Sequence, residues 1–272
     1  MKRLTIFTPT YNRAYILNKL YESLCGQTCQ DFEWLIVDDG STDDTRELVE
    51  GWMKEGMITI RYFYQENSGK MMAHNKAVEM SKGELFMCVD SDDRLCTGDV
   101  IADSLAFWNQ QHDIRGRNIA GFAAYKRMQD KSHTGEKALF FLRDVLAQHP
   151  FPHFEGEKFV TDVYIYDQIE SEYQMLQFPY YVQECKYNED GYSHNYMKLL
   201  FDNPIGFRAY HNQCVRLKKK GYVKSGICFV ALSLRVGGKG LLSETANLPL
   251  TLLIFPLGVL KYFYDQYRLS RI

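Results

Sequence analysis

The sequence predicts an α/β fold, in which a mostly parallel sheet is flanked by helices and followed by a helical or irregular C-terminal extension. Two observations support this prediction. Strand-like and helix-like segments alternate through about the first 90 residues, a pattern typical of βαβ units with right-handed crossovers. The last strand of this series contains a run of apolar residues at 85–89, as expected for a strand that is buried on both faces.

The first strand is expected over residues 4–9, where Pro9 closes it because proline cannot donate to a strand ladder. Residues 16–24 follow with apolar side chains at helical spacing, which predicts an amphipathic helix. Residues 33–37 are rich in apolar and aromatic side chains and predict the second strand. This strand runs directly into two aspartates and a glycine.

The second helix has a predicted start signal, since Ser41 and Asp44 have the spacing of a capping box. Its apolar face follows at residues 48–53. Residues 58–64 alternate as a third strand does, and a third helix is expected up to Gly83, which would end it. The buried fourth strand comes next.

Beyond the fourth strand the pattern weakens. A helix is expected from Asp99 to about Trp108, and residues 119–128 predict a further strand. From about residue 131 the alternation gives way to a mixed segment rich in Tyr, Phe, Pro and His.

The domain organisation expected from these patterns has two parts. Residues 1–212 form the main domain, with a ligand-binding half over 1–130 and a second half over 131–212. Residues 213–272 form an extension that carries a basic cluster at 216–224 and then apolar runs.

Composition limits the function. The net charge of −2 gives no support for nucleic-acid binding, and 46% hydrophobic with 24% charged residues is ordinary for a globular chain. Seven cysteines without metal or disulfide spacing predict free thiols in a reducing, cytosolic compartment. The first residues lack the pattern of a secretory signal peptide.

Two acidic clusters follow predicted strands, Asp38 with Asp39, and Asp90 with Asp92 and Asp93. Parallel strands place their carboxyl ends at one edge of a sheet, where ligands gather in open α/β folds. Crowded carboxylates at a buried strand end favour a positive partner, and a divalent cation that bridges to phosphates is the simplest one. Alternatively, these aspartates only make turns and cap helices.

Four motifs occur in order along the first half of the chain. They are Thr-Pro-Thr-Tyr-Asn-Arg at 8–13, Val-Asp-Asp-Gly-Ser-Thr-Asp at 37–43, Asn-Ser-Gly-Lys at 67–70 with His-Asn at 74–75, and Val-Asp-Ser-Asp-Asp at 89–93. In this order they resemble the family-2 glycosyltransferases, which have the Rossmann-like GT-A fold. Many members of that family build bacterial surface polysaccharides. The resemblance covers roughly residues 1–130.

The resemblance implies a nucleotide-sugar site on the first half. Thr8 and Tyr11 are expected to contact uracil or another base, with Tyr11 stacking on it. Asp39 is expected to hydrogen-bond the base, and Asp38 to support the same loop. The remaining donor-binding positions are Arg13, Lys70 and Ser91.

The resemblance also implies a metal site. Asp90, Ser91 and Asp92 match the D-x-D motif, in which Asp90 lies near the ribose and metal and Asp92 holds Mn²⁺ or Mg²⁺ on the diphosphate. Asp93 is expected to orient its neighbours or cap the next turn. His74 stands where many relatives carry Arg, so this chain departs from the family at a diphosphate-binding position.

The general base is expected in the second half. Residues 155–162 resemble the stretch that ends in the catalytic carboxylate of the family, which makes Asp162 the candidate in place of the commoner Glu. Alternatively, Asp162 caps the following helix, or Glu157 or Glu155 is the base. Residues 187–193 resemble a stretch that recurs in the family, and we expect a turn there that shapes the acceptor site.

The implied activity is inverting, metal-dependent transfer of a sugar, from a UDP-linked donor to a glycan acceptor that is expected to be lipid-linked. The metal would neutralise charge on the leaving diphosphate. A nucleotidyltransferase is the competing enzyme class, but it needs a Gly-rich loop after the first strand, and residues 8–13 contain no glycine. The non-enzymatic alternative is a nucleotide-sugar-binding scaffold without turnover.

The extension combines basic residues at 216–224 with apolar runs at 226–234 and 248–260, bordered by Lys261 and aromatic residues. Basic and apolar segments together favour an anionic membrane surface, which would place the protein on the inner face of the plasma membrane in the cytoplasm. Alternatively, the apolar runs pack onto the main domain or form a homodimer. Residues 248–260 are too few for a confident membrane span, which needs about 20.

Overall fold

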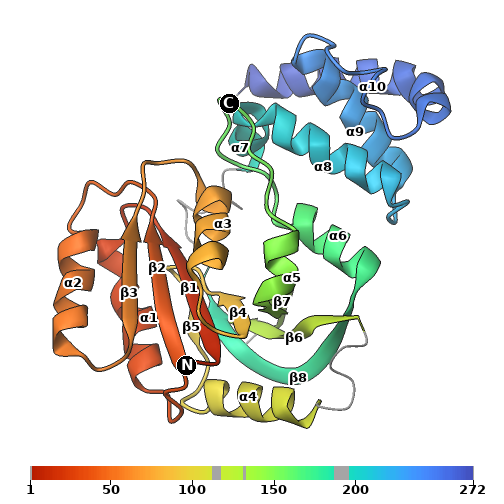
Figure 1. Cartoon of the computed structure of the whole chain (residues 1–272). Coiled ribbons are helices and arrows are strands. Elements are labelled where there is room, and N and C mark those ends of the chain that lie inside the picture. The colour runs from red at the N-terminus through yellow and green to blue at the C-terminus, as the bar shows by residue number, and fades with distance from the viewer. Residues whose placement is uncertain (1, 112–117, 131–132, 187–195, 272) are drawn as a thin grey trace. The chain divides into compact units, whose positions relative to one another are not determined.

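The computed structural model describes residues 2–111, 118–130, 133–186 and 196–271. It confirms the α/β class, with one eight-stranded sheet and helices packed against it (Figure 1). The strands are β1 (Leu4–Thr10), β2 (Phe32–Asp38), β3 (Ile60–Tyr64), β4 (Leu85–Cys88), β5 (Arg94–Leu95), β6 (Ile119–Met128), β7 (His133–Leu142) and β8 (Gln174–Cys185). The helices are α1 (Ala14–Cys25), α2 (Thr45–Glu55), α3 (Lys70–Met80), α4 (Val100–Gln110), α5 (Arg143–Gln148), α6 (Val163–Glu172), α7 (Tyr196–Asp202), α8 (Pro204–Arg216), α9 (Tyr222–Arg235) and α10 (Leu248–Leu269).

The chain divides into two compact units. The first comprises Met1–Phe151 and Asp167–Asn188, and the second comprises Pro152–Tyr166 and Glu189–Ile272. The division passes through α6, and the whole sheet belongs to the first unit. The boundaries expected after residues 130 and 212 stay predictions.

The sheet has the strand order β3-β2-β1-β4-β7-β6-β8-β5. Strands β1 to β4 pair in parallel, as the βαβ pattern predicts. Strand β7 runs antiparallel to both β4 and β6, whereas β8 is parallel to β6. The sheet is therefore mostly parallel in its first half and mixed in its second half.

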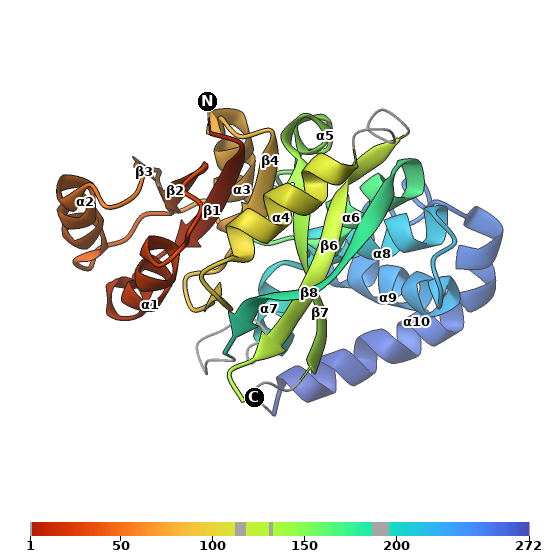
Figure 2. The ribbon, with the colours of Figure 1, turned by 90° about the horizontal axis from the view of Figure 1, so that it is seen from below.

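Alternate side chains of the central strands face two helical layers. Ile6 and Trp34 belong to the main core together with residues of α1, α2 and α4, and α4 crosses in front of the sheet in Figure 2. Phe7 and Phe86 point to the other face, where they meet α3. Both faces of the central strands are thus covered, which explains the unbroken apolar run in the fourth strand.

Two expectations about where a strand and a helix end were wrong. Pro9 lies inside β1 rather than closing it, at a position beyond Phe7, the last residue of β1 that pairs with β4. Gly83 does not end α3, which stops at Met80 with Ser81 as its C-cap. A Cβ on Gly83 would lie 2.5 Å from the backbone nitrogen of Thr5, so this glycine allows a close approach to β1.

The capping box expected at Ser41 and Asp44 is absent from the structure, so this expectation was also wrong. Asp44 occupies the N-cap position of α2 without a side-chain hydrogen bond, and Ser41 Oγ accepts from the Asn12 backbone instead. The carboxylate that caps the helix start is Asp43, which accepts hydrogen bonds from the backbone nitrogens of Thr45 and Ala14 at 3.1 Å each. Asp43 therefore joins the starts of α2 and α1.

The segment beyond residue 131 is more regular than its sequence indicates, because it contains the long strands β7 and β8. Strand β8 carries Pro179, which is unusual in a sheet interior. Its pairing with β6 shifts register between Gln177 and Tyr181, so the proline falls in an irregularity of the ladder.

In the second unit, α9 packs on both α8 and α10, with Phe229, Val230 and Ile254 in the core. Helices α9 and α10 approach closely, since a Cβ on Gly258 would lie 2.3 Å from Val230 Cγ1. The helix extends beyond the apolar run at 248–260, because α10 runs for 22 residues to Leu269. By length and composition it is the one helix among the described residues that could cross a membrane, with a mean hydropathy of 1.3.

Candidate active site

The carboxyl ends of β1, β2 and β4 bring the predicted motifs to one edge of the sheet in the first unit. Thr10 pairs with Asp38 in the register of β1 and β2. Asn12 joins the first two loops, because its amide oxygen accepts from Thr42 N and its backbone N–H donates to Ser41 Oγ, both at 2.8 Å. Asn12 has a positive φ of 54°, which Asn tolerates better than most residues.

Asp38 and Asp39 are buried and bind donors of the chain itself. Asp38 accepts hydrogen bonds from Ser41 N and from the Tyr62 hydroxyl. Asp39 accepts from Gln65 Nε2, Ser68 N and Gly69 N at 2.7–2.8 Å. Burial and the neighbouring Asp38 raise the pKa of Tyr62. Both aspartates therefore hold the loops of this edge, which is the structural role considered for them, and the base-binding role of Asp39 stays a prediction.

Thr8 and Tyr11 differ in their exposure. Thr8 is fully buried, and its Oγ1 accepts a hydrogen bond from Trp34 Nε1 at 2.9 Å. Trp34 in turn stacks with Tyr21 and Trp52, at centroid distances of 6.2 and 5.8 Å. Tyr11 is 49% exposed. Tyr11 is thus accessible at the surface, whereas Thr8 anchors the strand end from inside, and the base contacts expected of both residues stay predictions.

Asp90 forms an ion pair at this edge. Lys70 Nζ, at the first residue of α3, lies 2.7 Å from Asp90 Oδ1. Burial alone would raise the pKa of Asp90, but the charges of Lys70, Lys126 and Arg13 outweigh it and lower the pKa. Asp90 is therefore an ionised carboxylate in a cationic environment.

Asp93 is buried behind Asp90. It accepts from Gln183 Nε2 at 2.5 Å, and Cys185 Sγ lies 3.4 Å from the same oxygen. Burial and the nearby Asp90 raise the pKa of Asp93 to about 7, while Lys126, whose Nζ lies 3.9 Å away, opposes this rise. These contacts hold the Asp93 carboxylate in place, and its expected role of orienting its neighbours or capping the next turn stays a prediction.

Sequence reasoning missed Lys126 and Gln183. Lys126 lies on β6 with its side chain 16% exposed, and Gln183 is buried on β8. Lys126 and Arg127 interrupt the apolar run of the predicted strand at 119–128, and this interruption was an available signal for the first. No feature of the sequence pointed to Gln183, because β8 itself was not predicted.

His74 does not replace the cation that many relatives carry. Its ring is buried and meets Phe7, Phe86 and Phe151 edge-on at 5.7, 5.2 and 5.1 Å. Burial and the charge of Lys70 lower the pKa of His74 to about 3. The histidine is therefore a neutral core residue of this unit.

The donor set at this edge fits a divalent cation only in part. Among the described residues, no group of three His, Cys, Asp or Glu side chains converges as a metal centre. Asp90 and Asp92 offer hard carboxylate oxygens, and the Lys70 ammonium lies on Asp90 where a cation would be expected. Two carboxylates fit Mn²⁺ or Mg²⁺ when phosphates and water complete the coordination.

In the second unit, the candidate bases have different surroundings. Asp162 is exposed, and its Oδ1 accepts from Val163 N at 2.9 Å at the start of α6. Glu157 binds two backbone N–H groups at the start of α8, at 2.7 Å each, and burial raises its pKa. Glu155 is exposed. The acceptor-site turn expected at residues 187–193 lies outside the described residues.

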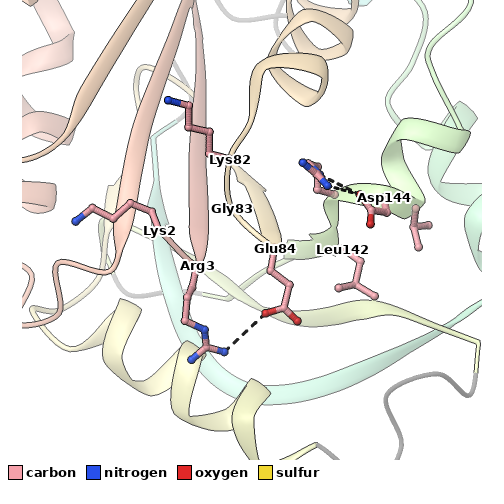
Figure 3. A pocket seen from close by; sticks show the side chains of 9 residues that line it. Lys2, Arg3, Lys82, Gly83, Glu84, Leu142 and Asp144 are labelled. Carbon is pink, nitrogen blue, oxygen red and sulfur yellow. Dashed lines mark hydrogen bonds and ion pairs between the residues drawn. The ribbon is translucent and has the colours of Figure 1, made fainter.

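A surface pocket lies at the opposite ends of β1 and β4 (Figure 3). Arg3 faces Glu84 at 3.9 Å, and Arg143 pairs with Asp144 at 2.6 Å. Because Arg3 precedes β1 and Glu84 precedes β4, this pocket is at the amino ends of the strands. It is therefore separate from the acidic edge.

Comparison with known proteins gives a family. Residues 5–170, more than half of the chain, match the family described as Glycosyl transferase family 2. A relative from Campylobacter jejuni, a GalNAc(5)-diNAcBac-PP-undecaprenol beta-1,3-glucosyltransferase, is 33% identical over 100 residues, which are 36% of this chain. The match spans 32% of that relative, or about a third of its length.

Solved structures share the fold. S. aureus TarS 1-349 in complex with UDP has a TM-score of 0.61 at 15% identity, with 99% of this chain and 91% of that chain covered. The mannosyltransferase PcManGT from Pyrobaculum calidifontis, in complex with GDP-Man and Mn²⁺, has a TM-score of 0.61 at 18% identity, with 98% and 82% covered. At such identities the likeness concerns the fold.

Proposed function

Because the chain belongs to glycosyl transferase family 2, we propose that it moves one sugar from a UDP-linked donor to a lipid-linked glycan acceptor by an inverting, metal-dependent reaction. The observation that carries this proposal is the acidic end of β4, where Asp90 is ionised beside Lys70 at the carboxyl edge of the sheet. The GT-A fold expected from the sequence is confirmed. Such an edge is where ligands of open α/β sheets bind.

The donor proposal draws support from the structural neighbours, one of which was solved with UDP and another with GDP-Man and Mn²⁺. In this chain, Tyr11 would stack on the base, and Asp38 and Asp39 would hold the loop beneath it. UDP is preferred over GDP on the resemblance of the motifs alone.

Asp90 and Asp92 would hold Mn²⁺ or Mg²⁺ against the diphosphate. The metal would neutralise the charge that grows on the leaving phosphate. The chain adds its own positive charge there, since Lys70, Lys126 and Arg13 all stabilise the ionised Asp90. Lys70 is the best placed to turn to a phosphate, because its pairing with Asp90 would be weakened once a metal binds that carboxylate. Ser91 would join the donor site through its place between the two aspartates.

Asp162 would take the proton of the acceptor hydroxyl, so that one displacement inverts the anomeric carbon. Its exposure supports this role, and Glu157 is the weaker candidate because both of its oxygens bind the start of α8. The hydrogen bond from Val163 N to Asp162 favours one competing function, a donor-binding scaffold without turnover, in which Asp162 is only a helix cap.

The acceptor and location are proposed from the relatives and the tail. The Campylobacter relative is named for a lipid-linked substrate, a PP-undecaprenol glycan. We extend that substrate class to this chain, together with a place on the cytoplasmic face of the plasma membrane. A homodimer remains the competing explanation for the apolar tail.

The test is a binding titration of UDP and of GDP, each with Mn²⁺ and with chelator. The wild type should bind UDP at least about tenfold more tightly with Mn²⁺, and Asp92→Asn should lose that increment. Asp103→Asn, at an exposed aspartate of α4, is the matched control and should behave as the wild type. The proposal fails if neither nucleotide binds, or if binding ignores both metal and mutation. Metal-dependent binding without turnover on any acceptor would favour the scaffold.

A further inference from the structure

Helix α10 is apolar on the side that faces away from its own unit. Seven of its nine exposed large hydrophobic residues, all but Leu248 and Phe255, recur at helical spacing over about four turns, so these seven lie along one side of the helix. We name this side the outer stripe, and it consists of Leu252, Leu253, Leu257, Leu260, Phe263, Tyr264 and Tyr267. Leu253 is 78% exposed and Leu260 is 66% exposed, so the described part of the chain leaves the stripe largely uncovered.

The inner side of α10 is the more polar one. It packs on α9 through Thr251, Ile254 and Gly258, which are buried. Lys261 and Asp265 lie on the same side one and two turns further on, where they form an ion pair at 2.9 Å. The helix is thus inverted relative to a surface helix of a water-soluble domain, which turns its polar side to solvent. An apolar medium would suit the outer stripe better than water does.

The charge of this part of the chain indicates which medium. Residues 203–272 contain eleven Lys and Arg but only two Asp and Glu, a net charge of +9, although the whole chain has a net charge of −2. Exposed basic residues include Arg216, Lys218 and Lys224 around the turn between α8 and α9, and Arg268 and Arg271 at the end of α10. A partner for this surface should be both apolar and anionic.

A bilayer with anionic lipids has both properties. A second copy of this chain would cover the outer stripe but would also place one strongly basic segment against another, which repels. A membrane-spanning helix would be surrounded by lipid, whereas the inner side of α10 is held by α9 and carries the Lys261–Asp265 pair. A helix that lies in the interface buries only one side.

We propose that α10 docks this protein on an anionic bilayer by lying in the plane of its surface. The outer stripe enters the boundary between headgroups and acyl chains, and its aromatic end, from Phe263 to Tyr267, sits at headgroup depth, where Tyr is favoured. The basic residues of the segment attract the anionic headgroups of the bilayer. This inference deepens the location proposed above, but it depends on the tail alone and not on the transfer reaction.

The test measures binding of the full chain to vesicles without donor or acceptor. Vesicles of phosphatidylcholine with about a third phosphatidylglycerol are compared with pure phosphatidylcholine by flotation, at low and high salt. The wild type should bind the anionic vesicles at least about tenfold more strongly, and high salt should weaken the binding. Leu253→Glu with Leu257→Glu should lose the binding by at least about tenfold.

The control is Met53→Glu with Met57→Glu, which adds the same charge at two exposed apolar residues of α2 and the turn after it, in the first unit. This control should bind vesicles as the wild type does, and far-ultraviolet circular dichroism shows that both variants are folded. The proposal is overturned if the wild type binds neither vesicle, or if the α10 variant binds as the wild type does. It is also overturned if light scattering finds a dimer that only the α10 variant loses, or if the bound protein resists alkaline carbonate as a spanning helix would.

Discussion

At the residue scale, His74 shows how a titratable side chain becomes a core residue. Its ring is enclosed by Phe7, Phe86 and Phe151, so the charged form has no water around it. Burial, helped by Lys70, lowers its pKa to about 3, well below the value of about 6.5 for an unfolded chain. The folded protein therefore binds fewer protons than the unfolded chain between these values, and stability falls as the pH falls from 6.5 toward 3.

Replacing His74 by Phe should remove this pH dependence. Between pH 7.5 and pH 5.0, the wild type should lose ~2 kcal/mol of its free energy of unfolding through His74, and His74→Phe should not lose this part. Urea unfolding at the two pH values measures the difference. His153→Phe, at an exposed histidine, is the matched control and should keep the wild-type dependence. Equal losses in wild type and His74→Phe would show that the ring is not held as described.

At the element scale, one carboxylate joins the starts of two helices. Asp43 accepts from the first residue of both α1 and α2, whereas Asp44 has the N-cap position of α2 but no side-chain hydrogen bond. Asp43→Ala should therefore lower the free energy of unfolding by about 1–2 kcal/mol, because two backbone donors lose their partner. Asp44→Ala should change it by less than about 0.5 kcal/mol. Thermal or urea unfolding of both variants tests this, and similar losses would contradict the assignment.

The same helix start shows where sequence reasoning stops. The helices of the first 110 residues and strands β1 to β4 were predictable because their apolar spacing reflects two covered faces of one sheet, whereas the two-residue strand β5 was not predicted. The cap of α2 was not predictable, because Ser41 Oγ accepts a hydrogen bond from the backbone of Asn12 in another loop. No local sequence pattern reveals such a contact. Strand β8 was missed because Pro179 within it is tolerated only through a register shift against β6.

The candidate site was predictable to a similar extent. Its acids follow strands, so parallel pairing alone predicts that Asp38, Asp39 and Asp90 share an edge. The partners that set their charge come from further along the chain. Lys126 and Gln183 reach Asp93 from β6 and β8, and only the folded sheet brings those strands beside it.

At the scale of the whole molecule, the proposed donor residues all belong to the first unit and Asp162 belongs to the second. Asp162→Asn should therefore leave the affinity for UDP within about threefold and lower turnover by roughly 10²–10⁴-fold, the usual contribution of a general base. Asparagine can still accept from Val163 N, so the cap of α6 is kept. Isothermal titration and single-turnover assays measure the two effects. Unchanged turnover would remove Asp162 as the base and leave Glu155 as the next candidate.

The aromatic stack beneath the first strand has a practical consequence. Trp34 and Trp52 lie with ring centroids 5.8 Å apart and planes 27° from parallel, close enough for their electronic transitions to couple. The indole N–H of Trp34 donates a hydrogen bond to Thr8 Oγ1, near the edge where the donor is proposed to bind. Two of the three tryptophans in the chain thus form a chromophore pair that one hydrogen bond links to Thr8. We expect nucleotide binding at that edge to change the near-ultraviolet circular dichroism of this pair, with no label attached.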